Sequence, residues 1–146
     1  DYEAFREALD AWLPQAGSLI VFKVEGTFAR MKTRVVPGQE KPYPPLSEVA
    51  RTQPEFEFEN VAGTLVGVRL PTYMSGVNMA GYHFHFLSAD HSKGGHVLAF
   101  EMNAGAVCEA NLFEEFLMKS PPPEGGLIQA GGMSHEAFDS LLQQVE

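Results

Sequence analysis

The candidate residues are His83, His85 and His96, three of the four histidines in one short stretch of the chain. His83 and His85 are two residues apart in a segment with strand-like alternation, so both side chains project from the same face. If a hairpin is centred near Asp90 and His91, His85 lies opposite His96, with Cβ atoms about 4.5–5.5 Å apart. Three neutral imidazoles in this arrangement leave a fourth coordination position open, as catalytic metal sites do. The spacing predicts one divalent metal ion per chain, zinc or another metal.

Other interpretations remain open for these residues. A single histidine on an apolar strand is usually an ordinary sheet residue, but the clustering of three favours a metal. A cupin-like metalloenzyme also carries a His-x-His pair, and such sites add a glutamate a few residues later. Here Phe86, Leu87 and Ser88 follow instead. A further alternative is a non-catalytic metal-binding or assembly module.

Helical spacing of apolar residues predicts an amphipathic helix at each end of the chain. The first ends at Pro14, and the second follows the N-cap residue Ser134. Strands are expected between them, at residues 18–25, 27–36, 55–59, 64–70, 82–87 and 96–102. The first two are expected to be partners separated by Gly26.

The segments between these strands are less regular. The proline-rich residues 37–45 and the Pro/Gly-rich residues 121–132 are expected to be loops. Residues 46–52 fit a short helix, and residues 106–118 fit either a strand or a helix. The fold class is therefore α+β: a mainly antiparallel, mixed β-sheet with flanking helices, in two layers.

Composition limits the partners. The chain has 146 residues, of which 45% are hydrophobic, so it fits a single domain with a sizeable core. Its net charge of −9 argues against nucleic acid or an anionic membrane surface as partner. An anionic small molecule needs only one or two cations and stays possible. Cys108 is the only cysteine, so neither an intrachain disulfide nor a thiolate zinc cluster is expected.

A cytoplasmic location is the expectation, because the sequence shows no signal-peptide pattern and no apolar run of the roughly 20 residues that cross a bilayer. The first residue is Asp1 rather than Met. A leader could therefore precede the chain, and secretion stays open.

Three segments resemble the alpha-acetolactate decarboxylase family. They are residues 33–46 (TRVVPGQEKPYPPL), residues 63–71 (GTLVGVRLP) and residues 81–100 (GYHFHFLSADHSKGGHVLAF). They follow one another in the family's order and at similar separations. The resemblance covers most of residues 18–101.

The resemblance implies a bacterial zinc enzyme that converts 2-acetolactate, a 2-hydroxy-3-keto acid, to acetoin and carbon dioxide in the acetoin and butanediol pathway. It places the family's zinc ligands on His83, His85 and His96, its catalytic arginine on Arg34 and a tail glutamate on Glu146. It also implies a homodimer. Family members carry a long N-terminal portion with another active-site glutamate, which has no counterpart here. The chain is therefore expected to be one metal-binding domain, either the C-terminal part of a longer protein or a shortened homologue.

These parts suit the reaction. Loss of carbon dioxide leaves an electron pair that flows into the neighbouring ketone, and a divalent cation stabilises that charge as a Lewis acid. An arginine binds the carboxylate through a bidentate pair, and a carboxylic acid then delivers a proton. Without the resemblance, Arg34 would be part of a solvated stripe with Arg30 and Lys32. The alternating glutamates of residues 55–59 likewise predict a solvent-facing strand surface.

Overall fold

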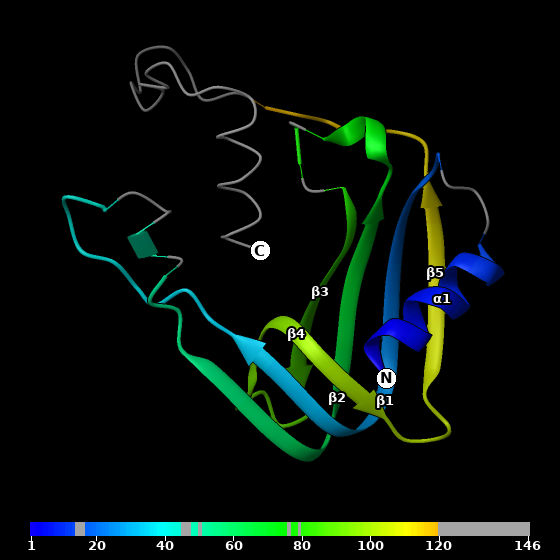
Figure 1. Cartoon of the computed structure of the whole chain (residues 1–146), viewed down its shortest axis with the longest axis horizontal. Helices are drawn as coiled ribbons and strands as arrows, with labels where there is room; N and C mark the ends of the chain where they lie inside the picture. Colours follow the sequence, from blue (N-terminus) through cyan, green and yellow to red (C-terminus); the bar gives the residue numbers. More distant parts are fainter. Residues whose placement is uncertain (14–16, 45–47, 50, 76, 79, 120–146) are drawn as a thin grey trace.

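The computed structural model describes residues 1–13, 17–44, 48–49, 51–75, 77–78 and 80–119 (Figure 1). Its elements in chain order are α1 (Tyr2–Trp12), β1 (Leu19–Arg34), β2 (Glu55–Leu70), the 3-10 turn η1 (Thr72–Met74), β3 (Gly81–Ser88), β4 (Gly94–Met102) and β5 (Val107–Phe113). The expected N-terminal helix and the two strands that carry the histidines are confirmed. The ambiguous segment after residue 106 forms the strand β5.

β1 is the central strand, because it pairs with three others. β2 lies along one edge of β1, and the other edge is shared by β5 at the N-terminal half and by β4 at the C-terminal half. β3 joins β2 to β4, so β1, β2, β3 and β4 form a closed circuit of ladders. Every ladder between the described strands is antiparallel. The domain is thus mostly antiparallel sheet with a helix, which fits the α+β class.

The predicted boundaries of β1 and β2 are wrong, because each is one continuous strand of 16 residues. Gly26 does not end a strand: it lies within β1, opposite Gly63 of β2. A Cβ atom on Gly26 would lie 2.8 Å from the Cβ of Ala106. The glycine therefore permits the close approach of the segment before β5, and not a turn.

In β1 and β2, the side of the strand that faces the core changes near residue 29 of β1 and residue 60 of β2. In β1 the buried positions are even-numbered up to Phe28, whereas Met31 and Thr33 are buried beyond it. Asn60 has a φ of 49°, in the left-handed region, and the ladder register is the same on both sides of it. As a result, even-numbered residues at the C-terminal end of β1 face away from the core.

Helix α1 covers the core face of the sheet (Figure 1). The rings of Tyr2 and Phe5 contact those of Phe84 and Phe100, with centroids 5.5–6.0 Å apart. Leu9, one turn further along the same face, is also buried. Because these rings come from β3 and β4, the helix packs directly behind the strands that carry the histidines.

A polar cluster of Arg69, Asp10 and Tyr82, here called the Arg69 cluster, attaches the end of α1 to β2 and β3. Arg69 Nη1 donates to Asp10 Oδ1 at 2.7 Å, and its Nη2 donates to the Leu13 carbonyl at 2.8 Å. The Tyr82 hydroxyl donates to the same Asp10 oxygen at 2.5 Å. Burial, with this hydrogen bond, raises the pKa of Tyr82 to about 12. The bond from Tyr82, and then Arg69, lowers the pKa of Asp10.

Several predictions concern residues that the structure describes only partly or not at all. The proline-rich loop is confirmed as far as Pro44, and Glu48 and Val49 are helical within the expected short helix. The loop at residues 121–132 and the helix after Ser134 lie outside the described residues. The two-layer arrangement with helices from both ends therefore stays a prediction. No helix in the described part of the chain is long and apolar enough to cross a membrane.

Candidate functional site

Four of the five predicted site residues meet where β1, β4 and β3 lie side by side. Arg34 is opposite His96 in the β1–β4 ladder, and His96 is opposite His85 in the β3–β4 ladder. These three residues therefore form a row across three strands, with His83 two positions along β3. The row lies on the outer face, because the alternating residues Phe84 and Phe86 of β3 are buried in the core. The predicted opposition of His85 and His96 is confirmed.

The three imidazoles converge. Ring centroids are 4.9 Å apart for His83 and His85, 4.7 Å for His83 and His96, and 5.5 Å for His85 and His96. One nitrogen from each ring can be chosen so that all three lie within 4.8 Å of one another. Tetrahedral zinc, with Zn–N bonds of about 2.0–2.1 Å, needs nitrogens roughly 3.3 Å apart. Small side-chain rotations give that spacing, so this donor set fits a divalent metal.

The hairpin turn fixes the register that brings the histidines together. Ser88 donates its backbone N–H to the Lys93 carbonyl at 2.9 Å, which closes the turn. Asp90 accepts hydrogen bonds from the Ser88 hydroxyl at 2.6 Å and from the Ser92 N–H at 3.1 Å. These bonds hold the pKa of Asp90 well below its usual range. His91 is exposed in the turn, with a φ of 58°, and it is not part of the β3–β4 ladder that carries the three imidazoles.

Gly95 allows β4 to approach β1 beside His96. Its φ is 137°, and a Cβ atom there would lie 2.6 Å from the Arg34 carbonyl oxygen. The Thr33 hydroxyl donates to the Gly94 carbonyl at 3.2 Å across the same contact. Together these features hold the backbone of Arg34 against the backbone of the metal-ligand candidate His96.

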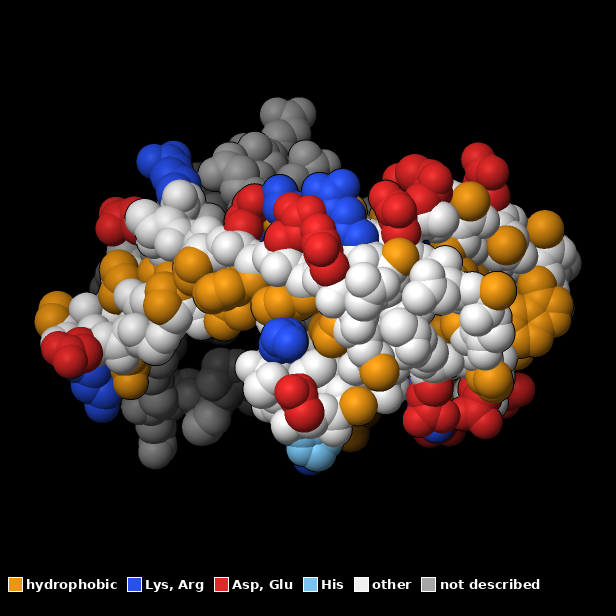
Figure 2. Space-filling model, turned by 90° about the horizontal axis from the view of Figure 1, so that it is seen from below, with side chains coloured by type: hydrophobic (Ala, Val, Ile, Leu, Met, Phe, Trp, Pro, Cys, Tyr) orange, Lys and Arg blue, Asp and Glu red, His pale blue; other side chains and the backbone are white. Residues whose placement is uncertain are grey.

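Arg34 is placed differently from the other two cations on its strand face. Arg30 forms an ion pair with Glu57, and Lys32 Nζ lies 2.6 Å from Glu55 Oε2. Figure 2 shows side chains of both signs next to one another on the face seen from below. Glu55 is the residue directly opposite Arg34 in the β1–β2 ladder, yet it pairs with Lys32. The expected solvated stripe thus describes Arg30 and Lys32 but not Arg34.

The Arg34 guanidinium is partly desolvated and available for a ligand. Its Nε and Nη2 atoms are buried and have no hydrogen-bond partner among the described residues. Nε and Nη2 share one edge of the planar guanidinium, and the N–H groups of that edge bind a carboxylate as a bidentate fork. A buried donor without a partner costs about 1–3 kcal/mol, so an anion at this position would relieve a real penalty.

These groups line one cavity of about 410 Å³. The residues around it are Arg34, Val35, Val36, Gln53, His83, His85, Gly95 and His96. The sequence did not point to Gln53, because nothing in the residues around position 53 indicates that the chain returns to the site there. Its Nε2 atom is buried without a partner in the described part of the chain. Glu146, predicted to reach the metal, lies outside the described residues.

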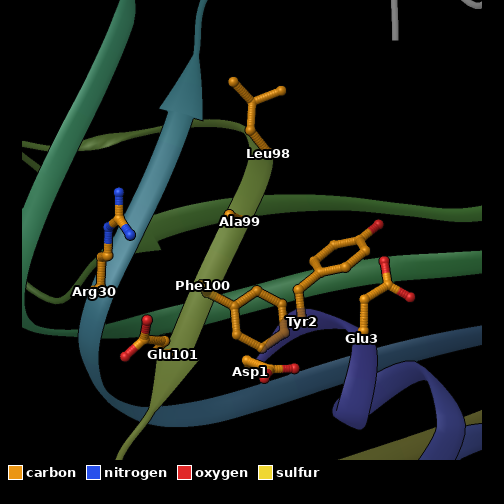
Figure 3. Close-up of a pocket in the computed structure, with 8 residues that line it drawn as sticks. All are labelled: Asp1, Tyr2, Glu3, Arg30, Leu98, Ala99, Phe100 and Glu101. Carbon is orange, nitrogen blue, oxygen red and sulfur yellow. The ribbon is translucent and has the colours of Figure 1, made fainter.

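A second groove, of about 330 Å³, lies between the start of α1 and β4 (Figure 3). Tyr2 and Phe100 form its apolar floor, with ring centroids 5.5 Å apart. Its cation, Arg30, is already paired with Glu57, and Asp1 accepts the N–H of Ala4 as the helix cap. This groove contains none of the predicted site residues, so the chemistry is assigned to the histidine cavity.

Comparison with known proteins identifies one family. Residues 1–125 match the family model for alpha-acetolactate decarboxylase. The chain is 46% identical over 121 residues to the alpha-acetolactate decarboxylase of Methylococcus capsulatus, which covers 83% of this chain and 46% of that protein. It is 48% identical over 113 residues to that of Methanosarcina mazei, covering 77% of this chain and 39% of that protein. The chain thus spans less than half the length of these relatives.

Solved structures give the same result. The alpha-acetolactate decarboxylase of Bacillus subtilis strain 168 superposes with a TM-score of 0.84 at 29% identity, covering 99% of this chain and 60% of that one. A Staphylococcus aureus protein of unknown function, similar to alpha-acetolactate decarboxylase, superposes with a TM-score of 0.87 at 29% identity, covering 99% and 61%. Since the family model matches most of the chain, this protein belongs to the alpha-acetolactate decarboxylase family.

Proposed function

We propose that the protein decarboxylates 2-acetolactate to acetoin and carbon dioxide, using a divalent metal, zinc in the first instance, held by His83, His85 and His96. The observation that best supports this proposal is that one cavity is lined by both the three histidines and Arg34. Three imidazoles converge beside a guanidinium whose carboxylate-binding nitrogens have no partner among the described residues. That is the donor set needed for a substrate with a carboxylate next to ketone and hydroxyl oxygens.

The first task of the chain's own residues is to bind and orient the carboxylate. Arg34 donates from Nε and Nη2 to the two carboxylate oxygens, which fixes the plane of that group. The backbone of Arg34 is held by its pairing with His96 and by the bond from Thr33 to Gly94. The position of the guanidinium is therefore tied to that of the histidines, and the carboxylate is oriented relative to the rest of the substrate.

When bound, the metal supplies Lewis-acid stabilisation of the negative charge that develops as carbon dioxide leaves. A proton must then return to the substrate carbon, and the predicted donor is the tail glutamate, Glu146. Its proximity to the histidines stays a prediction. The homodimer and the cytoplasmic location also stay predictions, the first of which light scattering of the purified chain would test.

A second candidate function uses the same three histidines. A metal-binding or assembly module without catalysis is the main competing proposal, because converging imidazoles can bind a metal whether or not a reaction follows. The two proposals share the metal site and differ in acetoin formation. A single set of proteins can therefore decide between them.

The test is zinc content and acetoin production of the wild-type chain, His85→Ala and His91→Asn. His91→Asn is the matched control, since His91 is exposed in the turn and Asn tolerates its positive φ. We expect one zinc per chain and acetoin from wild type and His91→Asn, with zinc and activity lost in His85→Ala. Full zinc in His85→Ala would overturn the metal assignment. A wild-type chain that binds zinc but makes no acetoin would favour the binding module.

A further inference from the structure

We propose that Gln53 is a specificity-determining residue, whose side-chain amide donates a hydrogen bond to the carboxylate held by Arg34 and so distinguishes the anionic substrate from the neutral product. This inference rests on the proposed function, because it adds a residue to the same cavity. It concerns this chain's own donors and does not depend on which metal is bound.

The backbone brings Gln53 to the site. Beyond the last pair of the β1–β2 ladder, Arg34 and Glu55, the Val35 N–H donates to the Pro54 carbonyl at 3.2 Å. This bond extends the antiparallel register to Val35 and Pro54. One residue further along the same register, position 53 falls opposite Val36. Residues on one face of a ladder alternate, so Gln53 is a diagonal neighbour of Arg34, within reach of two long side chains. Both side chains line the cavity that contains the histidines.

The donors in this part of the cavity lack acceptors. Gln53 Nε2, Arg34 Nε and Arg34 Nη2 are all buried, and none has a partner in the described part of the chain. Three nitrogen donors on two residues that line one cavity call for a ligand rich in acceptors. A carboxylate has two oxygens with about four lone-pair directions, enough for the arginine fork and one amide N–H together. A ketone or a hydroxyl alone cannot satisfy all three.

The chemistry of the reaction means that this contact distinguishes the substrate from the product. The substrate carries the carboxylate, which departs as carbon dioxide, and the product acetoin is neutral. A hydrogen bond from Gln53 to the carboxylate is therefore made by the substrate and lost by the product. The amide also adds this contact without a second positive charge. Gln53 would thus favour binding of 2-hydroxy carboxylates over their decarboxylated counterparts.

A purely structural role for Gln53 makes a different prediction. A structural amide is bonded within the protein, and its replacement by an apolar residue of similar size lowers stability. Gln53 Nε2 has no such partner among the residues that the structure describes, so Gln53→Leu should leave the urea midpoint of unfolding unchanged or raise it. The effect of the substitution should appear in ligand binding alone.

The experiment is calorimetric binding of two probes to the zinc-loaded and the metal-free chain. The probes are 2-hydroxy-2-methylpropanoate, a carboxylate that lacks the ketone, and acetoin, which is neutral. The proteins are wild type, Gln53→Leu, Gln53→Glu, Arg34→Ala and the control Gln39→Leu. Gln39 is an exposed glutamine of the same connection between β1 and β2, whose Nε2 donates to the Pro37 carbonyl at 2.8 Å.

We expect Gln53→Leu to bind the carboxylate roughly tenfold more weakly and acetoin as wild type does, since one hydrogen bond to a charged group is lost. Gln53→Glu should bind the carboxylate more weakly still, because it places a second negative charge beside it. Gln39→Leu should match wild type for both probes.

The outcomes separate this inference from the proposed function. If Arg34→Ala weakens carboxylate binding but Gln53→Leu does not, the inference alone is overturned. If Gln53→Leu weakens binding of both probes equally, the selectivity for the carboxylate is overturned. If wild type binds the carboxylate no more tightly than Arg34→Ala, or does not bind it, the arginine site fails and the inference fails with it.

Discussion

Two arginines of this domain are both shielded from water, yet they have opposite surroundings. Arg69 is 7% exposed, and its guanidinium donates to Asp10 and to the Leu13 carbonyl, so it joins α1 to the sheet. Arg34 lies on the outer face, and its Nε and Nη2 have no partner among the described residues. Arg69 is part of the scaffold, and Arg34 is the arginine that we propose binds a ligand.

The difference shows how binding capacity costs stability. Guanidinium hydrogen bonds to acceptors of the fold, such as those from the two Nη atoms of Arg69, stabilise the fold, whereas desolvated donors without acceptors destabilise it until a ligand arrives. The same sheet supports both states because Glu55, which the register places opposite Arg34, pairs with Lys32 instead. The two arginines therefore differ at Nη2, which meets the Leu13 carbonyl in Arg69 and meets no acceptor among the described residues in Arg34.

The largest effect is expected at the scaffold arginine. Arg69→Ala should lower the free energy of unfolding by about 2–3 kcal/mol, because hydrogen bonds to Asp10 and to a backbone carbonyl are lost together. Urea unfolding of the metal-free chain measures this. The control is Arg51→Ala, at an exposed position outside both arginine sites, which should stay within about 0.5 kcal/mol. An Arg69→Ala chain as stable as wild type would remove the distinction between the two arginines.

The converse is expected at the site arginine. Arg34→Ala should slow acetoin formation at least tenfold, since a charge-assisted contact is worth about 1.5–3 kcal/mol. Zinc content should be unchanged, and stability unchanged or slightly higher. Arg34→Lys, which keeps the charge but loses the planar fork, should fall between. Arg30→Ala is the control on the same strand face and should keep full activity. Unchanged kinetics in Arg34→Ala would exclude it from the mechanism.

A smaller effect tests whether Lys32 keeps Glu55 away from Arg34. Lys32→Ala releases Glu55, which can then turn to Arg34 and compete with the ligand. We expect binding of 2-hydroxy-2-methylpropanoate to weaken a few-fold, with stability changed by no more than about 1 kcal/mol, as for other surface ion pairs. Lys23→Ala removes an equivalent charge from a pair with Glu109 and should leave binding unaffected. Equal effects of the two variants would show that only net charge matters.

The metal-ligand candidates could be predicted from sequence because their geometry is local. The two-residue spacing places His83 and His85 on one face, and the turn at residues 88–93 sets the opposition of His85 and His96. Both depend on strand periodicity and turn chemistry, which nearby residues determine. The first helix and the strands β3 and β4 were predictable for the same reason.

The rest depends on contacts between distant segments. Gly26 allows close approach to Ala106, 80 positions later, and a glycine of this kind has no local feature that separates it from a turn. The difference between Arg34 and its neighbours Arg30 and Lys32 depends on which glutamate of β2 each one meets. Gln53 reaches the cavity only because the ladder continues past Arg34. None of these contacts leaves a pattern in the residues near it.

The hairpin that carries the histidines also affects the order in which the site can assemble during folding. His85 and His96 are 11 residues apart and meet across one tight turn, whereas Arg34 meets His96 from 62 residues away. Short-range hairpins close in about 1–10 μs, and long-range pairings must first overcome a larger loop-closure entropy. The three candidate metal ligands therefore come together early, and Arg34, the proposed carboxylate-binding residue, joins them late. The proposed metal site is thus expected to form before the proposed carboxylate site.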